Sequence, residues 1–82
     1  KAKIIELELK QCSWVESVVP VETNIVVAIL KDHNKRDEFI EKLKSKNCLI
    51  MAFGPGMLRM VTHLDISFED VEAFCSNLKR LN

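Results

Sequence analysis

The chain has 82 residues, 12 acidic and 12 basic side chains, and apolar residues at 48% of its positions. This composition predicts one small globular domain over residues 1–82 rather than a disordered segment. The balanced charge argues against a nucleic-acid partner, and no apolar run approaches the ~20 residues of a membrane-spanning helix. Because no secretory signal pattern is seen, we expect a cytoplasmic domain without a membrane partner.

The three cysteines, Cys12, Cys48 and Cys75, lie far apart in the sequence. They form no CxxC pair and no zinc-ligand spacing with the two histidines. An odd number of cysteines cannot pair completely within one chain. We therefore expect reduced, mostly buried thiols and no metal site.

The first half of the chain predicts one helix and two strands. Residues 3–12 fit both a helical face and strand alternation, and their Glu/Lys-rich background favours a helix. Residues 14–19 are rich in β-prone side chains, and Pro20 is expected to end that strand. Residues 24–30 form a nearly continuous β-branched run, which predicts a strand buried on both faces.

A second helix is predicted to begin at Asn34. Asn34 is a suitable N-cap, and Asp37 is placed to reach back to the helix start. The apolar residues that this helix turns inward are Phe39, Ile40 and Leu43. Asn47 is expected to end it in a left-handed conformation.

The last part of the chain predicts two strands and a helix. The strands cover residues 48–53 and 58–63, and the Gly54-Pro55-Gly56 turn joins them with glycines that accept positive φ. Ser67 with Asp70 begins the final helix as a capping-box variant. Its apolar face consists of Val71, Phe74, Cys75, Leu78 and Leu81. The element order therefore predicts an α+β fold with a small, mostly antiparallel sheet and helices on one face.

Arg59 is the strongest candidate for a binding residue, because its planar guanidinium matches a carboxylate. A regular strand would place Arg59 and His63 on one face and Thr62 on the other. The residues alone leave open whether Arg59 binds an anionic ligand or is an ordinary surface cation.

Polar residues on either side of this strand have structural alternatives. His63 is expected to bond to the backbone or to the Asp65 carboxylate, and a catalytic triad with Thr62 is not predicted because no serine or cysteine nucleophile is adjacent. The Asn24 side chain either hydrogen-bonds to the backbone of the turn before its strand or borders a substrate pocket. His33 lies in a polar loop and is expected to be solvated.

Residues 52–66 (AFGPGMLRMVTHLDI) and residues 21–26 (VETNIV) resemble the C-terminal part of low-specificity threonine aldolases. These are pyridoxal-phosphate (PLP) enzymes of the aspartate-aminotransferase fold type, and the resemblance covers about residues 14–81. It implies a small C-terminal domain that packs on a large cofactor-binding domain, in an enzyme that forms dimers or tetramers.

The reaction that the resemblance implies is retro-aldol cleavage of threonine or allo-threonine to glycine and acetaldehyde. It assigns the α-carboxylate of the amino-acid substrate to Arg59, and places Thr62, His63 and Asp65 near the site without a catalytic role. The Schiff-base lysine, the pyridinium-binding carboxylate and the phosphate cup belong to the large domain. We therefore expect no catalytic residue in this segment, and neither PLP binding nor activity in the chain alone.

A domain of this kind is expected to expose apolar surface where the large domain would pack. The residues expected at that surface are Trp14, Met51, Phe53 and Met57.

Three alternatives stay open. One is the small domain of another enzyme of the same fold type, such as an aminotransferase. A second is a free-standing ferredoxin-like binding or regulatory domain, which would show a further strand after the last helix. The third is a structural interaction module without a ligand pocket.

Overall fold

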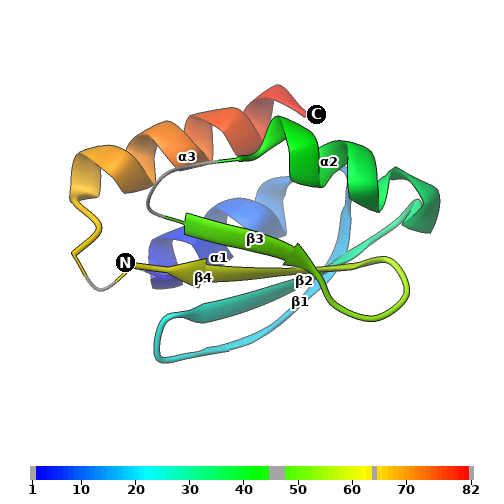
Figure 1. The fold of residues 1–82 in the computed structure, drawn as a ribbon, viewed down its shortest axis with the longest axis horizontal. Coiled ribbons are helices and arrows are strands. Elements are labelled where there is room, and N and C mark those ends of the chain that lie inside the picture. Colours follow the sequence, from blue (N-terminus) through cyan, green and yellow to red (C-terminus); the bar gives the residue numbers. More distant parts are fainter. Residues whose placement is uncertain (1, 45–47, 64, 82) are drawn as a thin grey trace.

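The computed structural model describes residues 2–44, 48–63 and 65–81. Its elements are α1 (Ala2–Gln11), β1 (Val15–Glu22), β2 (Ile25–Leu30), the 3₁₀ turn η1 (His33–Lys35), α2 (Arg36–Lys42), β3 (Cys48–Ala52), β4 (Met57–Thr62) and α3 (Phe68–Arg80). The strands are ordered β1-β2-β4-β3, and every neighbouring pair is antiparallel. The helices lie on one side of the sheet (Figure 1), which confirms the predicted α+β architecture. Within the described ranges, no helix has the length and apolar character needed to cross a membrane.

The sheet consists of two hairpins, β1–β2 and β3–β4, which join through the β2–β4 pair. β2, α2 and β3 form a split βαβ unit: β2 and β3 are each antiparallel to β4, which lies between them, and they therefore run parallel to each other. A ferredoxin-like sheet is built from units of this kind. The strand arrangement is therefore compatible with the ferredoxin-like alternative.

The helical interpretation of the first element is confirmed. Ile5 and Leu9 are completely buried, whereas Leu7, which strand alternation would place beside them, is 58% exposed. The four-residue spacing of the two buried side chains is that of one helix face.

The prediction that Pro20 ends the first strand is wrong, because β1 continues to Glu22. Pro20 lies on an edge strand, where its missing N–H removes no hydrogen bond of the sheet. The register of the β1–β2 pair also shifts here, between Val19 and Glu22. Beside this irregularity, the buried carboxylate of Glu6 accepts a hydrogen bond from the Val21 N–H at 3.2 Å. A side chain of α1 thus satisfies a backbone donor of the irregular strand.

The prediction that residues 24–30 are buried on both faces is also wrong. Val26, Ala28 and Leu30 are completely buried under the helices. Their neighbours on the other side, Ile25, Val27 and Ile29, are only half-buried. No described element covers that side of the sheet, which explains the difference.

The second helix begins differently from the prediction. Asp32, not Asn34, is the cap: its Oδ1 accepts a hydrogen bond from the Asn34 N–H at 3.0 Å and begins η1. α2 then starts at Arg36 without a side-chain cap of its own. Asp37 does not reach back to Asn34 and instead accepts a hydrogen bond from Arg36 Nε at 3.3 Å. Asn47, the predicted end of this helix, lies outside the described residues.

Several other local predictions are confirmed. Phe39 is buried on the inner side of α2, and Leu43 is buried directly after the helix. At the start of α3, Ser67 Oγ accepts from the Asp70 N–H at 3.0 Å and the Asp70 carboxylate accepts from the Ser67 N–H, which completes the capping box. The glycines of the β3–β4 turn both have positive φ, 70° at Gly54 and 65° at Gly56.

Candidate functional site

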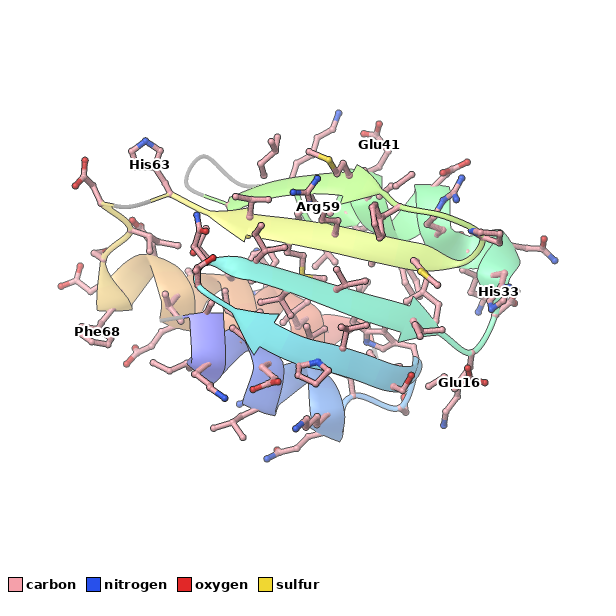
Figure 2. All side chains as sticks on the ribbon, turned by 90° about the horizontal axis from the view of Figure 1, so that it is seen from below. Glu16, His33, Glu41, Arg59, His63 and Phe68 are labelled. Atoms are coloured by element: carbon pink, nitrogen blue, oxygen red, sulfur yellow. The ribbon has the colours of Figure 1, made fainter. Side chains whose placement is uncertain are left out.

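The side of the sheet away from the helices, called here the open face, is apolar and is not covered by any described element (Figure 2). Its described side chains are Ser17, Val19, Ile25, Val27, Ile29, Leu49, Met51, Phe53, Met57, Arg59 and Val61. Three of the apolar ones are strongly exposed: Val19 at 43%, Leu49 at 60% and Phe53 at 49%. An apolar surface of this extent is typical of a contact with another protein surface or a ligand.

Arg59 is the one charged side chain among these residues, and it lies in the middle of the sheet (Figure 2). Strand alternation turns it away from the buried residues Leu58 and Met60. Its cross-strand neighbours are Val27 on β2 and Met51 on β3. The site is therefore a half-buried cation surrounded by apolar side chains.

Phe53 adds an aromatic contact to this cation. The Arg59 guanidinium carbon lies 5.8 Å from the centre of the Phe53 ring, within the range of a cation–π interaction. The sequence interpretation did not connect these two residues. The signal was available: in an antiparallel hairpin with Met51 opposite Arg59, Phe53 is the diagonal neighbour on the same face.

Arg59 has no carboxylate within ion-pair distance among the residues that the structure describes. Arg36 is different, because its guanidinium pairs with Asp37 and donates to the Gly54 carbonyl at 2.7 Å. A guanidinium in apolar surroundings is favoured by an anionic partner that matches its fork. Arg59 is therefore able to bind a carboxylate that comes from outside the described chain.

Asn24 and Thr62 lie together at the end of the sheet where β2 begins and β4 ends. Asn24 Nδ2 donates to the Thr62 carbonyl at 2.9 Å, and the Thr62 N–H and Oγ1 donate to the Asn24 carbonyl at 3.0 and 3.3 Å. Thr62 is 3% exposed and lies on the helix side, as alternation predicted. These bonds favour the structural alternative for Asn24, since its amide donor already ties the two strand ends.

His63 follows β4 and is exposed at the end of the sheet, apart from Arg59 (Figure 2). Its Nδ1 accepts a hydrogen bond from the Asp65 backbone N–H at 3.2 Å. Of the two expected bonds of His63, the structure thus shows the one to the backbone. Thr62, His63 and Asp65 do not converge on Arg59. In the described part of the chain, no three His, Cys, Asp or Glu side chains form a metal-binding group.

His33 lies at the opposite end of the sheet and is exposed, as predicted (Figure 2). Its ring packs over the β3–β4 turn, where a Cβ added to Gly56 would collide with it. Together with the positive φ of Gly56, this contact explains why glycine is needed at that position.

A hollow of about 250 Å³ lies on the open face over β1 and β2. β2 is the neighbour of β4, the strand that carries Arg59. The hollow is lined by Val19, Pro20, Ile25 and Val27, which are all apolar. None of these described lining residues offers a polar side chain to orient a ligand. Recognition of a carboxylate on this face would therefore depend on Arg59.

The three cysteines are buried free thiols, as expected. Burial raises the pKa of Cys48 from its ordinary value of 9.0 to about 11. Burial, and secondarily the charge of Glu8, raises the pKa of Cys12 to about 11, and burial likewise raises the pKa of Cys75. Because the thiolate is the reactive form, none of these residues has the properties of a nucleophile at neutral pH.

The raised pKa of Cys48 predicts a loss of stability in alkaline solution. Between about pH 9 and about pH 11 the unfolded thiol releases its proton and the buried thiol keeps it, so the unfolded state binds fewer protons and the free energy of unfolding falls. Below pH 9 the thiol is protonated in both states, and Cys48 causes no pH-dependent loss in the free energy of unfolding. Urea unfolding across this range should show a steeper decline for the wild type than for Cys48→Ala. Equal slopes would contradict the burial of the thiol.

Comparison with known proteins gives no relative: no family model, curated protein or solved structure matches this chain significantly.

Proposed function

We propose that this chain is the small C-terminal domain of a PLP-dependent aldolase of the threonine aldolase type, a cytoplasmic carbon–carbon lyase. In this proposal the open face packs toward a large cofactor-binding domain, and Arg59 binds the α-carboxylate of a β-hydroxy-α-amino acid. The products are glycine and an aldehyde.

The observation that carries the proposal is the environment of Arg59. Its guanidinium lies on an apolar sheet face, contacts Phe53, and has no acidic partner among the described residues. The substrate carboxylate would supply that partner, in a bidentate contact that fixes the orientation of the amino acid. The motif resemblance at residues 59–65 supports the same assignment, and the fold agrees with the small sheet that the resemblance implies.

The described lysines do not fit a Schiff-base site. Every one of them is exposed. Four, Lys3, Lys42, Lys44 and Lys79, lie within ion-pair distance of glutamates. An active amine needs a desolvated or cationic environment that lowers its pKa. In this proposal, the groups that hold PLP and perform the chemistry therefore belong to the large domain.

The test of this assignment uses the full-length protein and the isolated chain side by side. The full-length protein with PLP should release glycine and acetaldehyde from threonine or allo-threonine, and borohydride should fix PLP to one lysine outside residues 1–82. The isolated chain should give neither product nor a stoichiometric reduced adduct. Formation of a 2-oxo acid instead of glycine would favour the aminotransferase alternative, and a specific adduct on the isolated chain would contradict the proposal.

A further inference from the structure

We propose that the outer edge of β3 is a homodimer interface, at which β3 of a second copy pairs antiparallel and joins the two sheets into one. This inference is independent of the substrate assigned to Arg59. It rests on which edge of the sheet is free, on the chemistry of the strand there, and on the contrast with the opposite edge.

The backbone groups of β3 alternate between the two sides of the strand. The Phe53 N–H donates to the Met57 carbonyl at 3.0 Å, so Met51 and Leu49, which follow the same alternation, direct their N–H groups toward β4. The N–H groups of Ile50 and Ala52 therefore point away from the sheet. β3 is the last strand in the sheet order, and no described strand pairs with that side.

The strand itself lacks the charge, the proline and the irregular pairing that protect many sheet edges. Its sequence, Cys48–Ala52 (CLIMA), contains no charge and no proline, and its pairing with β4 is regular over all five residues. Exposed, regular and apolar edge strands are templates for pairing with another chain. Its outward-pointing backbone groups are thus available to a partner strand.

The opposite edge, β1, is protected. Pro20 removes one N–H, the register shifts at two places, and Glu16 places an exposed charge on the strand. Proline, irregular pairing and edge charges are the devices by which sheets avoid edge-to-edge association. The difference between the two edges assigns the interface to β3.

A second copy is the partner that fits this edge. An antiparallel pair with two-fold symmetry about Ile50 places Ile50 opposite its own copy and Leu49 opposite Met51, so apolar residues meet apolar residues. The flanking helix α2 carries Glu38–Lys42 and Glu41–Lys44 ion pairs, and the chain has no net charge. Among the described residues near β3, the charges of these ion pairs are balanced, and the overall charge does not oppose the approach of two copies.

Sedimentation velocity over a hundredfold concentration range tests the inference. The wild type should shift from 9.4 kDa to twice that mass as its concentration rises. Ala52→Pro should remain monomeric, because it removes an outward N–H at an exposed position at the end of the strand. Val19→Lys is the matched control: it places a charge on the open face at the β1 edge and should leave the dimer intact.

Hydrogen exchange of individual amides gives a second measurement that requires no variant. Exchange at Ile50 should slow about tenfold or more on going from dilute to concentrated protein, since its N–H gains a partner only in the dimer. Met51, whose N–H points toward β4, should be protected at both concentrations. A wild type that stays monomeric, a dimer that survives Ala52→Pro, or a dimer abolished by Val19→Lys would each overturn the inference.

Discussion

Replacing Arg59 by alanine in the full-length protein is expected to lower kcat/KM for threonine cleavage about 30-fold to several thousandfold. Removing one partner of a desolvated, charge-assisted pair typically costs about 2–5 kcal/mol, and each 1.36 kcal/mol corresponds to a factor of ten. Arg59→Lys should recover only part of the loss, because an ammonium group cannot replace the two parallel donors of the guanidinium.

Steady-state kinetics and thermal unfolding, measured on the same samples, separate binding from folding. Arg59 lies on the open face and is not part of the buried core, so the alanine variant should unfold at nearly the wild-type temperature. Arg80→Ala provides the matched arginine control, since Arg80 is exposed at the end of α3 on the other side of the sheet. If both Arg59 variants keep near wild-type kcat/KM, Arg59 does not bind the substrate carboxylate.

The side chain of Trp14 is buried in the core, although it was expected on the exposed apolar surface. It is 9% exposed. Its ring meets Phe39 of α2 edge-on, with centroids 4.9 Å apart, and its Nε1 donates to the Leu78 carbonyl of α3 at 3.3 Å. Trp14 therefore joins the α1–β1 loop to two helices at once.

Phe53, by contrast, does lie on the exposed surface, as predicted, and Met51 and Met57 are half-buried there.

Trp14→Ala is expected to lower the free energy of unfolding by about 3–5 kcal/mol, the usual range for removing a large buried aromatic side chain. A domain of this length has roughly 4–12 kcal/mol of stability in total, so the variant should be close to unfolding at room temperature. Trp14→Phe should lose less, because it keeps most of the ring contact with Phe39 and gives up mainly the indole donor.

Urea unfolding followed by far-ultraviolet circular dichroism is the appropriate measurement, since Trp14 is the sole tryptophan and its fluorescence is lost in both variants. Phe53→Ala serves as the comparison, because this aromatic side chain is about half exposed and should cost much less. Equal stability of Trp14→Ala and Phe53→Ala would mean that Trp14 lies at the surface after all.

Features that depend only on neighbouring residues were predictable from the amino-acid sequence alone. The capping box of Ser67 and Asp70 needs only a spacing of three residues, and the glycine turn needs only positive φ at Gly54 and Gly56. The alternation that turns Arg59 outward and Thr62 inward follows from the geometry of any strand. For these reasons the element order, the fold class and the orientation of Arg59 were predictable.

Contacts between distant segments determine which apolar surfaces are covered and which strands lie at an edge of the sheet. The β-branched run of β2 has the same sequence pattern whether one side or both sides are covered, and only the placement of the helices leaves Val27 half-exposed. Pro20 is tolerated inside β1 because that strand happens to be an edge, a fact set by pairing partners far along the chain. The burial of Trp14 against Phe39 and Leu78 likewise depends on contacts between distant segments, which local spacing does not encode.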